Sequence, residues 1–267
     1  MDQDSTHTLL TGNEIPVMGL GTWQLTDDTA DTVVEAIEMG YRLIDTSSDY
    51  GTQPGIGRAL QQTTIERETL YIQTKVEETD DAYSATQTYL KELNIEYANM
   101  MLIHRPPDDG PGVELWQGLI RAQKEGLAVD IGVSNYRIDQ IQTLKEETGV
   151  WPVVNQIEWS PFGHSHEMLD FCESNGIFIQ AYSPLTREKR FENEVLQQLA
   201  QKHGKSPAQV LIRWNLELGT IPIPKANDTE HLEENLDVFD FTLGEEDVKK
   251  LHALNEQYSC LGELPYV

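Results

Sequence analysis

The sequence predicts an α/β protein folded as a (β/α)8 TIM barrel. Short apolar or β-branched runs recur eight times, and each is followed by a segment with helical periodicity. The runs are nearly continuous in apolar character, which is typical of parallel strands covered by helices. The 267 residues suit one barrel of roughly 250 residues. No linker or low-complexity tract interrupts the pattern, so we expect residues 1–267 to form a single domain.

The eight predicted strands are distributed along the whole chain. They are residues 17–22, 41–47, 70–76, 99–105, 129–135, 152–159, 177–185 and 219–225. A doubly wound open sheet is the alternative fold. Against it, no strand is followed by a complete G-x-G-x-x-G, and GLGTW at 19–23 lacks the third glycine of a dinucleotide-binding turn.

Amphipathic helices are predicted in the intervals, with two of them before the eighth strand. They are residues 28–40, 84–94, 112–126, 136–149, 165–176, 193–204, 206–219 and 245–255. Asp28 to Asp31 are capping candidates for the first helix, which Gly40 ends. Pro54 is expected in the first turn of a further helix, where proline is tolerated.

The charge balance excludes one class of partner. The chain has 19 basic and 45 acidic residues, with a formal net charge of −26. Such a charge repels nucleic acid. The acids are dispersed along the chain, which suits a solvated surface. Because molar salt shortens the Debye length to about 3 Å and relieves self-repulsion, we expect a halophilic host.

The sequence carries no sign of a membrane segment. No apolar run approaches the roughly 18 residues that span a bilayer, and MDQDSTHTLL at the start is acidic and polar, unlike a signal peptide. We therefore expect a cytoplasmic protein with no membrane partner. Cys172 and Cys260 are far apart and lack metal-ligand spacing, so neither a disulfide nor a metal is predicted.

Polar and aromatic residues recur at the C-terminal ends of the predicted strands, where such barrels place their active sites. They are Trp23, Asp45 with Tyr50 just beyond it, Lys75, His104, Ser134, Asn135, Gln156, Tyr182, Ser183 and Lys225. Each alone has a structural explanation, such as a buried ion pair between Lys75 and Asp45 or a core position for His104. Their recurrence at neighbouring strand ends favours a site.

Eight motifs in order make the chain similar to an aldo-keto reductase from about Pro16 to Gly244. They are GLGTWQ, RLIDTSSDYG, YIQTKV, LIHRP, IGVSNY, VNQIEWSP, AYSPL and IPKANDTEHLEENLDVFDFTL. The short chain, the compact loop at 106–111 and the brief C-terminal segment resemble the prokaryotic 2,5-diketo-D-gluconate reductase branch. The resemblance implies NAD(P)H-dependent reduction of a small aldehyde or ketone to an alcohol by a monomeric enzyme.

The resemblance also implies a catalytic tetrad of Asp45, Tyr50, Lys75 and His104. A carbonyl that accepts hydride must be protonated, and a phenol with the ordinary pKa near 10 is a poor acid at neutral pH. The ammonium of Lys75 is expected to lower the pKa of Tyr50. Asp45 would keep Lys75 protonated, and His104 would donate to the carbonyl oxygen.

The nicotinamide cofactor is expected to contact many of the same strand ends. The implied set is Thr22, Asp45, Ser134, Asn135, Gln156, Tyr182, Ser183, Leu185, Lys225, His231, Glu234 and Asn235. Within it, Tyr182 would stack on the nicotinamide ring. Positions that usually carry Ser and Arg for the 2′-phosphate hold Ala226 and His231, so we expect NADPH, with NADH left open.

The expected substrate contacts are Trp23, Tyr50, His104 and Arg105. Arg105 replaces a tryptophan that often follows the catalytic histidine, which makes anionic sugar acids credible substrates. An equally good interpretation pairs Arg105 with Asp108 or Asp109.

Two other functions stay open at this point. One is a non-catalytic NADP(H)-binding sensor or regulatory subunit with the same fold. The other is an unrelated barrel enzyme in which Lys75 forms a Schiff base.

Overall fold

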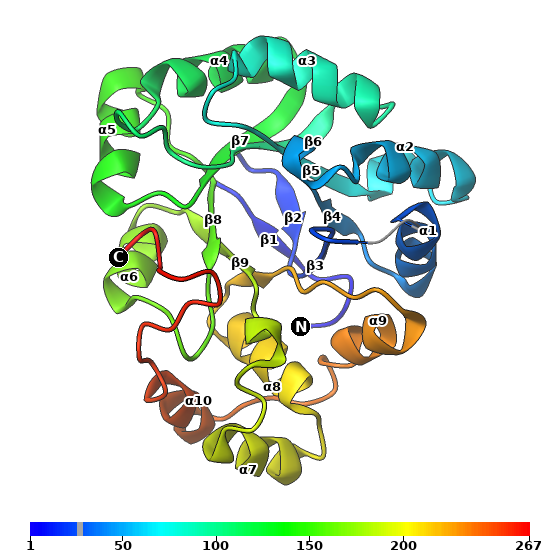
Figure 1. Cartoon of the computed structure of the whole chain (residues 1–267), viewed down its shortest axis with the longest axis vertical. Coiled ribbons are helices and arrows are strands. Elements are labelled where there is room, and N and C mark those ends of the chain that lie inside the picture. Colours follow the sequence, from blue (N-terminus) through cyan, green and yellow to red (C-terminus); the bar gives the residue numbers. More distant parts are fainter. Residues whose placement is uncertain (26–28) are drawn as a thin grey trace.

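The structure, a computed structural model, describes residues 1–25 and 29–267. Its centre is an eight-stranded parallel sheet whose strands lie side by side in chain order (Figure 1). The strands are β3 (Gly19–Gly21), β4 (Leu43–Asp45), β5 (Tyr71–Val76), β6 (Ala98–Ile103), β7 (Ala128–Ser134), β8 (Val154–Glu158), β9 (Phe178–Tyr182) and β10 (Ile221–Pro222). Each predicted strand overlaps one of these, and the predicted TIM-barrel fold is confirmed.

The first and last strands of this sheet meet through a backbone hydrogen bond. The Gly21 amide donates to the Pro224 carbonyl oxygen at 3.1 Å. A Cβ at Gly21 would lie 2.7 Å from the Ile223 carbonyl oxygen, so only glycine permits this approach. The GLGTW segment therefore contributes to barrel closure rather than to an open-sheet dinucleotide turn.

Helices follow the strands and form the outer layer (Figure 1). They are α1 (Thr29–Met39), α2 (Gln53–Gln62), α3 (Ala82–Glu92), α4 (Val113–Lys124), α5 (Ile138–Thr148), α6 (His166–Ser174), α7 (Glu194–His203), α8 (Pro207–Glu217), α9 (Thr229–Leu236) and α10 (Glu245–His252). Both α7 and α8 precede β10, and Pro54 lies in the first turn of α2, as predicted. The cap predicted at Asp28 lies outside the described residues.

An N-terminal hairpin, which the sequence analysis did not predict, covers the opposite end of the barrel from the polar strand ends. Its strands are β1 (Thr6–Thr8) and β2 (Glu14–Pro16), which pair antiparallel. Leu9 and Ile15 are buried in a cluster of barrel-interior residues. Thr11 and Asn13 donate to Asp130, near the start of β7. The hairpin thus leaves the C-terminal ends of the strands as the open end.

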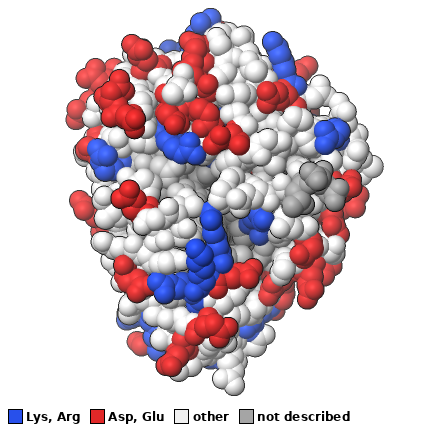
Figure 2. Space-filling model, in the orientation of Figure 1, with Lys and Arg blue, Asp and Glu red and all other residues white. Residues whose placement is uncertain are grey.

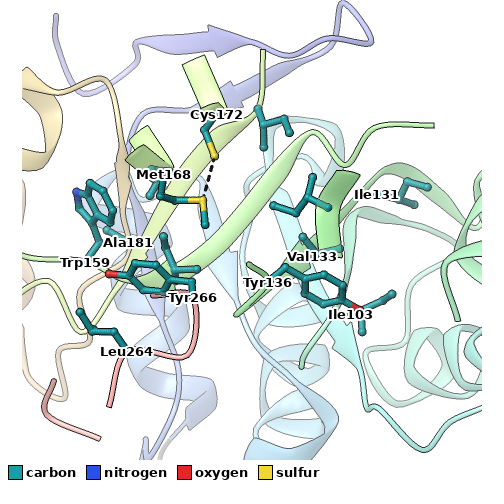
Figure 3. Packing of buried hydrophobic residues seen from close by; sticks show 14 of the residues in the cluster. Ile103, Ile131, Val133, Tyr136, Trp159, Met168, Cys172, Ala181, Leu264 and Tyr266 are labelled. Atoms are coloured by element: carbon teal, nitrogen blue, oxygen red, sulfur yellow. Dashed lines mark hydrogen bonds between the residues drawn. The ribbon is translucent and has the colours of Figure 1, made fainter. Parts of the chain in front are cut away.

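The C-terminal segment packs back onto the barrel. Figure 3 shows Leu264 and Tyr266 beside Trp159, in the apolar layer that also contains Met168 and Cys172. The Tyr266 hydroxyl donates to the Glu158 carbonyl oxygen at 2.7 Å, which anchors the segment at the end of β8. Among the described residues, no helix has both the length and the apolar character needed to cross a bilayer.

Candidate active site

A cavity of about 610 Å³ opens at the C-terminal ends of the strands. Figure 2 shows Lys and Arg side chains beside the central hollow, whereas acidic side chains dominate the surrounding surface. The predicted site residues that line this cavity are Trp23, Asp45, Tyr50, His104, Arg105, Ser134, Asn135, Gln156, Tyr182, Ser183, Leu185 and Lys225. The polar residues that the sequence placed at separate strand ends therefore share one cavity.

Lys75 lies beneath the cavity in a fully buried ion pair. Its Nζ donates to Asp45 Oδ1 at 2.8 Å and Oδ2 at 2.9 Å, and to the Thr46 carbonyl oxygen at 2.8 Å. Burial lowers the pKa of Lys75, and the charge of Asp45 opposes that effect. The pairing matches the prediction that Asp45 orients Lys75.

Tyr50 ends the short 3₁₀ helix η1 (Ser48–Tyr50), which follows β4. The Lys75 Nζ lies 3.3 Å from the Tyr50 hydroxyl and 4.8 Å from the centre of its ring. Burial raises the pKa of Tyr50 well above its usual value, and the nearby charge of Asp45 adds to the rise. This shift is opposite in direction to the lowering expected from the Lys75 ammonium, because burial of the phenol outweighs it.

Three buried glutamines form a network around Asp45. Gln73 Nε2 donates to Asp45 Oδ1 at 2.7 Å, and Gln156 Nε2 donates to the same oxygen at 2.9 Å. Both amides also donate to Gln180 Oε1, at 2.6 and 2.7 Å. The sequence analysis missed Gln73 and Gln180, although a polar residue inside each apolar run, YIQTKV and IFIQAY, was a usable signal. The network holds the carboxylate of Asp45 in place for Lys75.

His104 hydrogen-bonds to Glu77, which is not among the residues predicted for the site. Its Nδ1 lies 2.8 Å from Glu77 Oε2 and 3.1 Å from Oε1. Burial acts to raise the pKa of Glu77, but hydrogen bonds from His104, Ser47 and Ser48 outweigh it and lower the pKa to about 2. Glu77 comes two residues after Lys75, directly after the end of β5, so its position beside the site was readable from the sequence.

The Glu77 contact determines which nitrogen of His104 carries a proton. Burial lowers the pKa of His104, an effect that Glu77 opposes, so the ring is neutral near pH 7. A carboxylate only accepts, hence Nδ1 carries the hydrogen of the neutral ring and Nε2 carries a lone pair. His104 can donate from Nε2 only as the imidazolium. The predicted role of His104 as a donor therefore requires that it take up a proton.

Arg105 lines the cavity, but its ion pairs differ from those predicted. Its guanidinium lies 3.4 Å from Asp49, 3.6 Å from Glu77 and 3.6 Å from Glu78. Within the described residues, Arg105 forms no ion pair with Asp108 or Asp109, so that predicted pairing is wrong. Glu77 and Glu78 follow β5, which is the strand directly beside β6, whereas the sequence alone favoured partners close along the chain.

A hydrogen-bonded group of predicted cofactor residues forms one wall of the cavity. The Tyr182 hydroxyl donates to Asn135 Oδ1 at 2.9 Å, and Asn135 Nδ2 donates to the His104 carbonyl oxygen at 3.0 Å. Ser134 Oγ donates to the Gln156 carbonyl oxygen at 2.8 Å. These bonds fix Asn135, whose φ of 66° lies in the left-handed region that asparagine tolerates.

Two cations lie at another part of the cavity wall. Arg187, in the 3₁₀ segment η3 (Thr186–Glu188), packs its guanidinium 4.4 Å from the ring centre of Trp23. Lys225 donates to the Gln24 carbonyl oxygen at 3.3 Å. Burial and the charge of Arg187 lower the pKa of Lys225, so the two cations are close enough to interact. The sequence analysis missed Arg187, which belongs to the basic run REKR at 187–190.

Four predicted cofactor residues are not part of the cavity lining. Thr22 is buried and donates to the Asp45 carbonyl oxygen at 2.9 Å. His231 is exposed, with its Nδ1 2.9 Å from Asp228. Glu234 and Asn235 lie on α9, and Asn235 is buried.

Comparison with known proteins identifies close relatives. The sequence model of the Aldo/keto reductase family matches residues 17–256. The methylglyoxal reductase DkgA of Escherichia coli (strain K12) is 38% identical over 251 residues, covering 92% of this chain and 91% of that protein. The glyoxal reductase of Bacillus subtilis (strain 168) is 37% identical, with the same coverage of 92% and 91%. The crystal structure of a Bombyx mori aldo-keto reductase in complex with NADP is 34% identical, with a TM-score of 0.89 and coverage of 96% and 94%.

Proposed function

This chain belongs to the aldo/keto reductase family, and from that premise we propose that it reduces a small 2-oxoaldehyde, with Tyr50 as the proton donor. Family membership and the reductase relatives make it an NAD(P)H-dependent oxidoreductase acting on carbonyl compounds, with NADPH as cofactor. The observation that carries the proposed mechanism is the contact of the Tyr50 hydroxyl with the Lys75 Nζ at 3.3 Å. The roles of individual residues follow from such contacts.

The cavity residues fit a nicotinamide cofactor. Arg187 and Lys225 are cations on the cavity wall of a strongly acidic protein, which suits a phosphate-bearing ligand. Asn135 and Gln156 offer amide groups for the carboxamide, and Tyr182 offers an aromatic face for the ring. When bound, the cofactor supplies the hydride.

Tyr50 provides the proton that the reduced carbonyl oxygen requires. Its raised pKa keeps the phenol protonated at neutral pH, and a developing alkoxide is a stronger base than a phenolate. After the transfer, the phenolate lies beside the ammonium of Lys75, which stabilises the new charge. Asp45 and its glutamine network keep Lys75 charged and fixed in position.

His104 and Glu77 supply the second polar contact to the substrate oxygen. In the protonated state His104 donates from both nitrogens, with Nδ1 directed to Glu77 and Nε2 left for the carbonyl oxygen. Glu77 stabilises that imidazolium by its charge. We therefore assign Glu77 as a positioning residue that acts through His104.

The charges around Arg105 favour an uncharged substrate over a sugar acid. One guanidinium lies within 3.6 Å of three carboxylates, those of Asp49, Glu77 and Glu78, so the cation is more than balanced. An anionic substrate gains little there. Methylglyoxal and glyoxal reductases among the relatives support a small 2-oxoaldehyde. The 2,5-diketo-D-gluconate reductase branch remains our proposal for subfamily, with sugar acids as the poorer substrates.

Turnover with purified protein tests the proposed function. We expect NADPH oxidation with methylglyoxal, a higher kcat/KM for methylglyoxal than for a keto-acid sugar, and loss of turnover in Tyr50→Phe. Tight NADPH binding with no turnover on any aldehyde would favour the sensor or regulatory subunit instead. Comparison of kcat/KM for NADPH and NADH measures the effect of Ala226 and His231.

The cellular setting is proposed from charge and composition. We propose a salt-adapted, cytoplasmic, monomeric enzyme formed by a single domain, and the net charge of −26 with its dispersed acids supports the salt adaptation. Sedimentation at low and molar salt tests the monomer.

A further inference from the structure

Three histidines from two distant parts of the chain converge outside the cavity. His164 lies in the loop between β8 and α6, His166 is the first residue of α6, and His252 is the last residue of α10. One ligand nitrogen from each lies within 4.8 Å of the others. The closest pair is His252 Nδ1 and His164 Nε2, which are 3.1 Å apart. None of the three lines the active-site cavity.

His164 is held as metal-ligating histidines usually are. Its Nδ1 lies 3.1 Å from the Ser160 carbonyl oxygen, an acceptor, so Nδ1 carries the hydrogen and Nε2 carries the lone pair. The His164 backbone is fixed by Asn255, whose Nδ2 donates to the His164 carbonyl oxygen at 2.8 Å. The lone pair at Nε2 is thereby directed toward His252.

Burial favours the neutral form of His164 and of His252. Burial lowers the pKa of His164 to about 4, and the neighbouring His252 and His166 contribute to that shift. Burial and His166 also lower the pKa of His252. Trp214 packs against His164 and His252, with ring centres 5.3 and 5.4 Å away. Neutral imidazoles are the form that binds metal ions.

We propose that His164, His166 and His252 bind a divalent transition-metal cation, with Zn²⁺ as the ion that best fits the donors. Zinc–nitrogen bonds of roughly 2.0–2.1 Å place tetrahedral ligand nitrogens about 3.3 Å apart. The 3.1 Å pair matches that spacing. His166 is exposed, so its side chain can rotate to complete the set, and water fills the fourth position. If His252 binds through Nδ1, its hydrogen moves to Nε2 and no proton is released.

The ion would link α10 to the loop before α6 and so support the C-terminal segment. Beyond α10, the Cys260 amide donates to Glu158 Oε1 at 2.7 Å, and Leu261 lines the active-site cavity. Figure 3 shows Tyr266 from the same segment beside Trp159, whose ring centre is 5.6 Å from that of His164. A ligand that binds only the folded state raises its stability, so bound Zn²⁺ should raise the melting temperature.

Zinc titration of the untagged, metal-free full-length protein tests the site, with binding followed by calorimetry and by Trp fluorescence. We expect one saturable Zn²⁺ per chain and a higher melting temperature. His166→Ala should weaken binding by at least about tenfold, since losing a ligand costs no less than losing an outer-shell partner. His166 is exposed, so this variant retains the fold. His252→Ala should weaken binding similarly.

His231→Ala is the matched control, because it removes an exposed histidine elsewhere and should leave Zn²⁺ affinity unchanged. Mg²⁺ is the control ion, since it prefers oxygen ligands and reports carboxylate binding. Cobalt substitution should give the visible absorption of a tetrahedral site in the wild type only. Absence of saturable Zn²⁺ binding, or equal binding by wild type, His166→Ala and His252→Ala, would overturn the proposal.

Discussion

Lys75 and Tyr50 are joined by a 3.3 Å contact at the floor of the cavity, and the other acceptors of the Lys75 ammonium are Asp45 and the Thr46 carbonyl oxygen. The ammonium is therefore held by a counter-charge on one side and presented to the phenol on the other. In the proposed mechanism, this arrangement lets a phenol with a raised pKa give up its proton, because the phenolate that results is paired at once.

Asp45→Asn should reduce both stability and turnover. The change leaves the buried charge of Lys75 without its partner, which costs about 3–5 kcal/mol of unfolding free energy. Adding Lys75→Met should recover part of that stability, since no unpaired charge remains. It should not restore turnover. Urea unfolding and NADPH oxidation are the measurements. Equal stability of wild type and Asp45→Asn would show that the pair is not buried as described.

Glu77→Gln should move the pH profile of kcat to lower pH. Glu77 acts to raise the pKa of His104, so replacing the carboxylate by an amide lowers that pKa. As the pH rises, His104 then loses its proton, and with it the donor at Nε2, at a lower pH than in the wild type. Glu78→Gln is the matched control, because Glu78 also pairs with Arg105 but makes no recorded contact with His104. Identical shifts in both variants would assign the effect to Arg105 instead.

Arg187→Ala should raise the KM for NADPH with little change in kcat. The change removes a cation from the cavity wall and the packing on Trp23, which affects binding in the ground and transition states equally. Lys189→Ala is the control, since Lys189 is exposed, lies on the same loop and does not line the cavity. A similar rise in both variants would indicate a general loss of positive charge rather than a contact.

Unfolding free energy should increase with KCl concentration up to the molar range. Screening relieves the repulsion among 45 acidic residues, which are opposed by only 19 basic ones. Glu245→Gln combined with Glu246→Gln should reduce the salt dependence, since both side chains are exposed. Equal stability in dilute buffer and in molar KCl would argue against salt adaptation.

The strands and most of the site were predictable because each depends on local pattern. Buried parallel strands are short apolar runs, and a polar residue near the end of a run lies at the barrel mouth or just beneath it, as His104 and Lys75 do. The N-terminal hairpin escaped prediction because its strands have three residues each and no apolar run.

The missed features depend on which elements become neighbours. The ion pairs of Arg105 form because β5, which Glu77 and Glu78 follow, lies beside β6. Asp108 and Asp109 were predicted instead because they are close to Arg105 along the chain. The histidine cluster joins His164 to His252, 88 positions apart, through the return of α10 to the β8 side. The expectation of no metal rested on cysteine spacing, which does not address imidazole ligands.

The measurement that tests the central claim most directly is single-turnover reduction of methylglyoxal by Tyr50→Phe, with NADPH binding measured in parallel. The phenyl ring keeps the cavity shape but has no proton to give. Our account predicts that the rate falls by about 10²–10⁴, the usual contribution of a general acid, while NADPH affinity is essentially unchanged. A Tyr50→Phe variant that reduces methylglyoxal at the wild-type rate would contradict it.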